Sequence, residues 1–254
     1  MTEFLPISST AHLLLLGKAI GYDDPGGVFT VMIQLGSILA VVWVYRVRLF
    51  GIAARLTSSA EARHFAAAVI VATLPVLLAG ALFADYIQSV LYKSPRVFAG
   101  AFIIGGLVML LVERLRPAPV VVEVERTPLS RAFGVGVCQV LSLVPGVSRS
   151  GATIIGGLAM RLDRTTAAEF SFFVAIPTMS AAFAHEFLEV HDQLTAARSA
   201  EIAVGLAMAF VSSLLIIKPF LGFVRRAGFA PFAWYRIALG VALLAAIGAG
   251  WVQG

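Results

Sequence analysis

The sequence predicts an all-α, polytopic integral membrane protein, and its composition and its long apolar runs carry this prediction. Hydrophobic residues make up 59% of the 254 residues and charged residues 13%, against about 45–50% and about 25% in soluble globular proteins. Six apolar runs approach the roughly 20 residues that a helix needs to cross a bilayer. The composition excludes a soluble enzyme and a disordered chain. The single cysteine, Cys138, excludes a disulfide scaffold.

The apolar runs fall into two classes of length. The six expected spans cover residues 29–45, 65–84, 97–112, 170–184, 202–217 and 233–249. Three further pieces, 11–21, 132–144 and 152–160, are too short to cross a bilayer. The first follows a Pro, Ser and Thr stretch, and the other two flank a Pro, Gly and Ser stretch at 145–151. Apolar helices broken in this way indicate two re-entrant helical hairpins at membrane depth.

The basic residues gather on one side of this predicted topology. If each hairpin enters and leaves on the same side, one face holds 14 of the 19 Lys and Arg: Arg46, Arg48, Arg55, Arg63, Arg114, Arg116, Arg126, Arg131, Arg161, Arg164, Lys218, Arg225, Arg226 and Arg236. The other face holds Lys18, Lys93, Arg96 and Arg198. The positive-inside bias then makes the first face cytoplasmic and places both chain ends outside. No nucleic-acid partner is expected from this excess of positive charge, because the basic residues are distributed as in a membrane protein.

The two halves of the chain share a pattern. Pro6 precedes Ser9 by three positions, and Pro145 precedes Ser148 by three. Each unit then has three spans, and because three is odd, the second unit is inverted relative to the first. The prediction is a single membrane domain, 1–254, built of repeat one (1–112), a cytoplasmic linker (113–131) and repeat two (132–254). An inverted-topology repeat brings segments 2–12 and 144–153 together near the midplane.

Arg149 is the one basic residue that is assigned to neither face. It follows a Gly- and Ser-containing stretch at the start of a predicted helix. A planar guanidinium matches phosphate oxygens, and the amides and dipole of a helix N-terminus also favour an anion. The alternative is a structural ion pair with Glu3. Because Gly and Ser on both sides are what a backbone cradle needs, the pattern favours an anion site.

Glu3 and His12 lie on either side of the first hydroxyl cluster. Position alone would put Glu3 in solvent, whereas the repeat brings it to the midplane, where it could bind a divalent cation or orient a water. A lone His on an apolar helix is commonly a satisfied structural group. Next to a carboxylate and an Arg, His12 could instead serve as a general acid or base.

Two hydroxyl and glycine clusters complete the candidate site. The predicted substrate-binding residues are Ser8, Ser9, Thr10, Ser148, Ser150, Gly151 and Thr153. Helix capping is the most frequent role of any one such hydroxyl, and it is compatible with phosphate binding. A serine nucleophile is the weaker alternative, because no Ser-His-Asp arrangement is recognisable.

Four stretches give the chain a resemblance to a known family. The motifs TEFLPISSTAH at 2–12 and VPGVSRSGAT at 144–153, with IQLGSILAVV at 33–42 and AAEFSF at 167–172, resemble the undecaprenyl pyrophosphate phosphatase family linked to bacitracin resistance. The likeness covers essentially the whole chain. It implies an enzyme of the bacterial inner membrane that removes the terminal phosphate of a C55 isoprenyl diphosphate, so that the lipid carrier is used again in cell-wall synthesis.

The resemblance also implies a cofactor and residue roles. Family members need a divalent cation, Mg²⁺ or Ca²⁺. Glu3 would be the second carboxylate of the acidic motif and a metal ligand, His12 its histidine and Arg149 the phosphate-binding arginine, so these three are the expected catalytic residues. The family has another Glu four residues before the position of Glu3, which here would precede Met1. We therefore expect the natural protein to begin upstream, with a further half-helix of about 15–20 residues.

A transport function is the rival hypothesis. Secondary transporters and lipid flippases also use inverted repeats, broken helices and a midplane anion site. The expected partners are a polyprenyl diphosphate and the bilayer, and homodimerisation is left open.

Overall fold

The computed structural model describes residues 2–22, 24, 27–87, 91, 94–190 and 195–250, and these residues are almost entirely helical. The helices are α1 (Ser9–Ile20), α2 (Val28–Val44), α3 (Arg46–Ala54), α4 (Ala60–Tyr86), α5 (Pro95–Leu115), η3 (Val124–Arg126), α6 (Leu129–Val140), η4 (Leu141–Leu143), α7 (Arg149–Ala159), α8 (Arg164–Val190), α9 (Ala196–Ala227) and α10 (Ala230–Gly248). No strand is found within the described ranges.

The predicted segments correspond closely to these helices. The six expected spans lie in α2, α4, α5, α8, α9 and α10, and the three short pieces lie in α1, in α6 with η4, and in α7. Within the described part of the chain, α4, α5, α8, α9 and α10 are long and apolar enough to cross a membrane, and α2 with α3, bent by 71°, makes a sixth if counted as one span. An all-helical membrane protein is thus confirmed.

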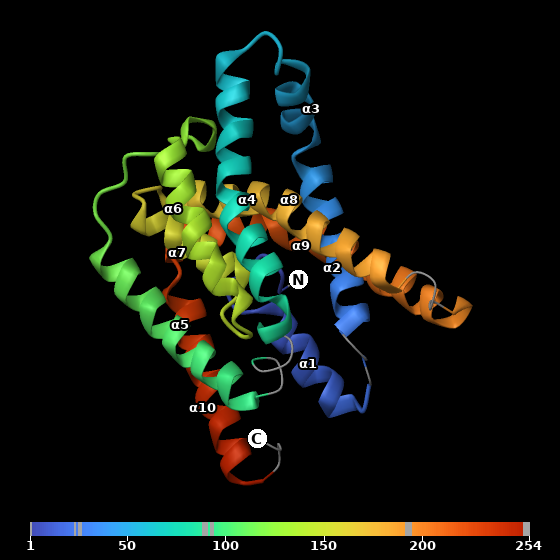
Figure 1. Ribbon diagram of the computed structural model, residues 1–254. Helices are drawn as coiled ribbons and strands as arrows, with labels where there is room; N and C mark the ends of the chain where they lie inside the picture. The colour runs from blue at the N-terminus through green and yellow to red at the C-terminus, as the bar shows by residue number, and fades with distance from the viewer. Residues whose placement is uncertain are drawn as a thin grey trace.

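Close helix crossings hold the bundle together (Figure 1). Helix α5 packs against α10, α2 packs against α8 and α9, α4 covers α6, and α7 lies between α6 and α8. At the α2–α9 crossing, a Cβ added to Gly36 would clash with the Leu206 carbonyl oxygen. Small residues let helix backbones approach in this way, which matters in lipid because association there depends on packing.

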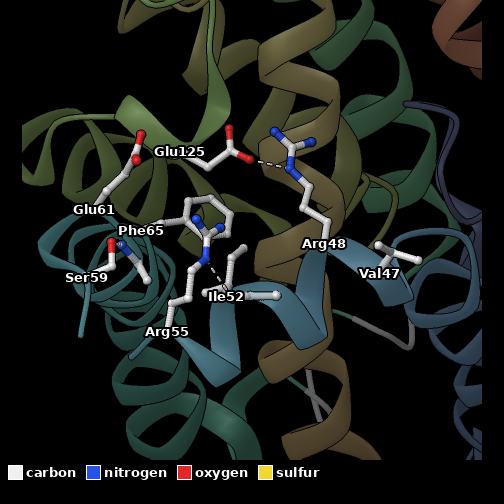
Figure 2. A pocket seen from close by; sticks show the side chains of 10 residues that line it. Val47, Arg48, Ile52, Arg55, Ser59, Glu61, Phe65 and Glu125 are labelled. Atoms are coloured by element: carbon white, nitrogen blue, oxygen red, sulfur yellow. Dashed lines mark hydrogen bonds and ion pairs between the residues drawn. The ribbon is translucent and has the colours of Figure 1, made fainter. Parts of the chain in front are cut away.

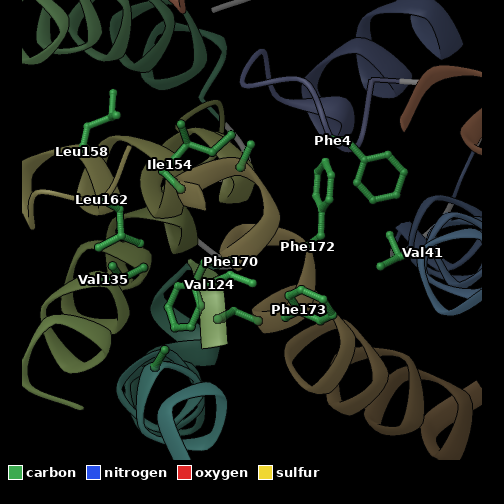
Figure 3. Close-up of a cluster of buried hydrophobic side chains, with 14 of the residues drawn as sticks. Phe4, Val41, Val124, Val135, Ile154, Leu158, Leu162, Phe170, Phe172 and Phe173 are labelled. Atoms are coloured by element: carbon green, nitrogen blue, oxygen red, sulfur yellow. The ribbon is translucent and has the colours of Figure 1, made fainter. Parts of the chain in front are cut away.

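Phe4 anchors the N-terminal segment in the interior. Its ring is fully buried and meets Phe172 edge-on, with ring centroids 5.1 Å apart. Phe170 and Phe173 of α8 belong to the same cluster (Figure 3). Because Phe4 is held in this core, the adjacent Glu3 is also buried, with 8% of its surface exposed. Glu3 is therefore not a residue in solvent.

Two serines with positive φ precede the short helices α1 and α7. Ser8 has φ 67° and Ser148 has φ 73°, a region that residues other than Gly seldom occupy. In both cases the helix begins at the next residue and the serine carbonyl accepts the first helical hydrogen bond, from His12 N or Ala152 N. The positive φ falls on Ser8 and Ser148, one residue before Ser9 in the first motif.

The expected position of Arg236 was also wrong. The charge count put it on the basic face at the start of the last span, but the structure buries it within the bundle with 1% of its surface exposed. Two of the four basic residues expected on the opposite face have no described side chain. Lys93 lies outside the described residues, and only the backbone of Lys18 is described.

The α2–α9 crossing gives a test of the fold. We expect Gly36→Leu to lower the thermal unfolding temperature of the detergent-solubilised protein by several degrees, because the side chain must push the helices apart. Gly222→Leu is the control, since an added Cβ at this α9 position has no neighbour within 4 Å. Equal unfolding temperatures for the two variants would contradict the described crossing.

Candidate active site

A cavity of about 170 Å³ joins the two sequence motifs. Both serine turns reach it, and α2, α4 and α8 complete its wall. The lining residues are Glu3, Ser8, Ser9, Thr10, Gln34, Val76, Ser142, Leu143, Pro145, Gly146, Ser148, Arg149, Ser150, Thr178, Met179 and Ala182. The wall therefore combines several hydroxyls, one carboxylate and one guanidinium with apolar side chains.

Glu3 and Arg149 form a buried ion pair in this wall. Arg149 Nη2 donates to Glu3 Oε1 at 3.2 Å, and the side chains are 11% and 8% exposed, respectively. Glu3 Oε2 and Arg149 Nε are buried without a hydrogen-bond partner. Buried polar atoms are normally paired, so these two atoms mark a place where a ligand would complete the site.

Ser171 of α8 holds Arg149 from the other side. Arg149 Nη1 donates to the Ser171 carbonyl at 3.2 Å and lies 3.5 Å from its hydroxyl. The Ser171 hydroxyl is 2.7 Å from that of Thr153, one turn along α7 from Arg149. Ser171 is fully buried, so it acts on the site through Arg149. No motif or spacing in the sequence pointed to this role of Ser171.

The hydroxyls of the second motif form a directed chain. The Leu5 carbonyl can only accept, so Ser150 Oγ donates to it, at 2.9 Å. Ser148 Oγ, 3.2 Å from Ser150 Oγ, is then the donor to Ser150 and accepts from Gly151 N at 3.1 Å. Ser148 is thus an N-cap of α7, as expected for such a residue, and the Ser150 bond links the two motifs.

His12 faces away from the cavity lining. Its Nδ1 lies 2.8 Å from the Ser8 carbonyl and donates to it, and its Nε2 lies 2.7 Å from the Tyr235 hydroxyl. The imidazole also stacks on the Tyr235 ring. With both nitrogens engaged, the ring supports the Ser8 turn, which has a positive φ.

Comparison with known proteins fits this combination of motifs. The model of the family described as bacitracin resistance protein BacA matches residues 1–242. The chain belongs to this family. Among its curated relatives, undecaprenyl-diphosphatase 1 of Agrobacterium fabrum is 48% identical over 97% of this chain and 92% of the relative. The undecaprenyl-diphosphatase of Phenylobacterium zucineum is 47% identical over 94% and 90%, and that of Caulobacter vibrioides is 45% identical over 96% and 92%.

This BacA family member brings most of the predicted site together. Of the ten residues predicted from sequence, seven line the cavity, and His12, Gly151 and Thr153 lie outside its lining. Gln34, Ser142 and Thr178 are polar lining residues that the sequence did not single out as site residues. Gln34 Nε2 lies 3.3 Å from Thr10 Oγ1, so α2 contributes to the first motif. Gln34 lies in the stretch 33–42 that resembles the family, and this resemblance is the sequence signal that could have identified it as a site residue.

A second cavity, of about 180 Å³, lies between α3, α4 and the segment around η3, and contains no motif residue (Figure 2). Arg48 donates to Glu125 there. Burial alone would raise the pKa of the Glu125 carboxyl, but the hydrogen bond and charge of Arg48 outweigh it and hold this pKa below its ordinary value. Arg55 and Glu61 add one charge of each sign, so the second cavity has no net excess of positive charge for a phosphate.

Two variants of His12 separate support of the Ser8 turn from proton transfer. We expect His12→Asn to keep most of the phosphatase activity, because the Asn amide can still donate to the Ser8 carbonyl. His12→Leu, which cannot, should lose about tenfold or more, since losing a buried hydrogen bond costs about 1–3 kcal/mol. Phosphate release at several pH values is the measurement. If both variants are equally inactive, His12 transfers protons and the supporting role is wrong.

Proposed function

We propose that this protein hydrolyses undecaprenyl diphosphate to undecaprenyl phosphate and inorganic phosphate. The observation that carries the proposal is the convergence of the two motifs on one cavity, whose wall includes Arg149, Glu3 and several hydroxyls. The family match and the relatives named undecaprenyl-diphosphatase support it. Val76, Leu143 and Met179 on the same wall suit the first isoprene units of a lipid substrate.

In the proposed reaction, the oxygen of a water attacks the terminal phosphorus in line with the bridging oxygen. The bond between that phosphorus and the bridging oxygen breaks, and the lipid leaves as the monophosphate. Arg149 binds the non-bridging oxygens and stabilises the charge that spreads over them. Glu3 orients the water and accepts its proton. The hydroxyls of Ser8, Ser9, Thr10, Ser148 and Ser150 hold the diphosphate.

The residues present fit a divalent cation, which we propose as the cofactor. The part of the chain that the structure describes holds no group of three or more His, Cys, Asp or Glu that could enclose a metal. Mg²⁺ commonly uses only one or two carboxylates and takes its remaining ligands from substrate phosphates and water. Glu3 Oε2, buried and without a partner, suits that role. When bound, the cation would neutralise negative charge on the diphosphate.

We further propose the finer membrane architecture. Six spans, with re-entrant hairpins at α1 and at α6–α7, form an inverted repeat in the bacterial inner membrane, with both termini periplasmic. The positive φ of Ser8 and of Ser148, each directly before a short helix, supports the repeat. The basic residues in the linker 113–131 and in α3 support a cytoplasmic location for these segments.

Matched substitutions test the proposed chemistry. Purified protein should release phosphate from a polyprenyl diphosphate, and Glu3→Gln and Arg149→Lys should each lower kcat about 100-fold or more, because each removes stabilisation specific to the transition state. Glu61→Gln and Arg126→Lys are the controls, since these side chains are 60% and 70% exposed and far from the motifs in sequence. Turnover like that of the wild type in both site variants, or anion flux without phosphate release, would refute the proposal.

Cation removal provides an independent test. EDTA should abolish phosphate release, and added Mg²⁺ or Ca²⁺ should restore it. Glu3→Asp, which keeps a carboxylate but shortens its reach, should raise the cation concentration needed for half-maximal activity about tenfold, a loss in the range seen when ligand geometry is disturbed. Full activity in EDTA would exclude the proposed cofactor.

A further inference from the structure

Arg236 of α10 is a buried cation that the proposed reaction does not use. It is 1% exposed and forms no ion pair with any acid among the residues that the structure describes. Instead its guanidinium donates to four backbone carbonyls. Nη1 contacts those of Pro6 at 3.2 Å and Val147 at 2.8 Å, and Nη2 contacts those of Ala101 at 2.9 Å and Gly146 at 3.0 Å. A charge buried at this cost inside a membrane protein usually has a function.

The four carbonyls are not an arbitrary set. Pro6 lies two residues before Ser8, and Gly146 lies two residues before Ser148, the two serines with positive φ. One guanidinium thus binds the equivalent carbonyl in each turn, together with Val147 in the second turn. Its position relative to α5 is fixed by the Ala101 carbonyl. Arg236 is therefore a physical link between the two turns that carry the candidate site.

The surrounding backbone leaves room for this guanidinium. A Cβ added at Gly105 would clash with Arg236 Nη2, and one added at Gly151 would lie 3.1 Å from Nη1. Gly105 belongs to α5 and Gly151 to α7, so two separate helices keep space for the same side chain.

The bonds to these carbonyls also orient the amides of the second turn. A trans peptide is planar, so its C=O and the following N–H point in opposite directions. Because the Val147 carbonyl points at Arg236, the N–H of Ser148 points away from it. Ser148 lines the cavity and Arg236 does not.

From these contacts we infer that Arg236 is a positioning residue for the reaction, which holds the Ser8 and Ser148 turns at the separation and orientation that a diphosphate requires without touching the substrate. This inference rests on the proposed function for the identity of the substrate. Displacement of a bound substrate by about 1 Å can cost roughly 100-fold in rate, so a clamp behind the turns can control kcat.

The first experiment moves Arg236 without removing its charge. Gly105→Ala places a methyl group against Nη2, and we expect kcat for polyprenyl diphosphate hydrolysis to fall at least tenfold while KM stays within about threefold. Gly100→Ala is the matched control in the same helix, since an added Cβ there has no neighbour within 4 Å. If Gly105→Ala turns over like Gly100→Ala, the positioning role is refuted.

The second experiment removes the guanidinium and measures the turns themselves. In Arg236→Met, amide hydrogen exchange should accelerate in both segments 2–10 and 144–152, and kcat should fall about 100-fold or more. Arg236→Lys should restore part of both properties. Arg131→Met is the control, because Arg131 donates to the Met160 carbonyl, which belongs to neither turn.

The possible outcomes separate the two proposals. Lost activity with unchanged exchange in both turns would overturn the inference, and so would faster exchange confined to one turn. If Arg236→Met does not fold, the Lys variant decides, since native exchange in both turns without activity would also refute a positioning role. The exchange measurement does not depend on the substrate, so a wild-type protein that releases no phosphate would refute the proposed function alone.

Discussion

The structure depends on how it satisfies the backbone polar groups of the two turns that directly precede the short helices α1 and α7. Lipid offers no hydrogen bonds, so irregular backbone at membrane depth persists only where protein groups or an aqueous cavity satisfy it. Here hydrogen bonds link the two turns. Ser150 donates to the Leu5 carbonyl, and Arg236 binds carbonyls of both turns. The second motif thus supplies a donor to a carbonyl of the first, and Arg236 is a donor that both turns share. Residues of both motifs line the cavity.

Both serine turns carry backbone strain, and the same groups that create the site offset it. A non-glycine residue with positive φ costs on the order of 1–3 kcal/mol and persists only where the surroundings hold it. Ser148 is held by the amide of Gly151 and by Ser150, and the Ser8 carbonyl is held by His12. Tyr235, which holds His12, directly precedes Arg236 in α10. Helix α10 therefore supports both turns through two adjacent side chains.

The sequence predicted most of the helices because a membrane span is a local property of length and apolarity. It predicted the convergence of Glu3 and Arg149 because a repeat pattern is also visible in one dimension. Burial of Arg236 was not predictable, since positions at span ends are usually interfacial and its four carbonyl partners lie 89 to 230 residues away in sequence. The positive φ of Ser8 and of Ser148 was not predictable, because the spacing of prolines does not encode a backbone angle. Ser171 and Thr178 were missed because they lie within an apolar span, where hydroxyls are ordinary packing residues.

One arginine at the site would not balance the negative charge of a diphosphate. The Glu3–Arg149 pair is nearly neutral before substrate arrives, so a diphosphate would bring more than one uncompensated negative charge into a region of low dielectric constant. Arg236 lies behind both turns and forms no ion pair with an acid among the residues that the structure describes, so at the proposed site its positive charge would add to a field that favours an anion. The proposed cation at Glu3 would supply the remainder.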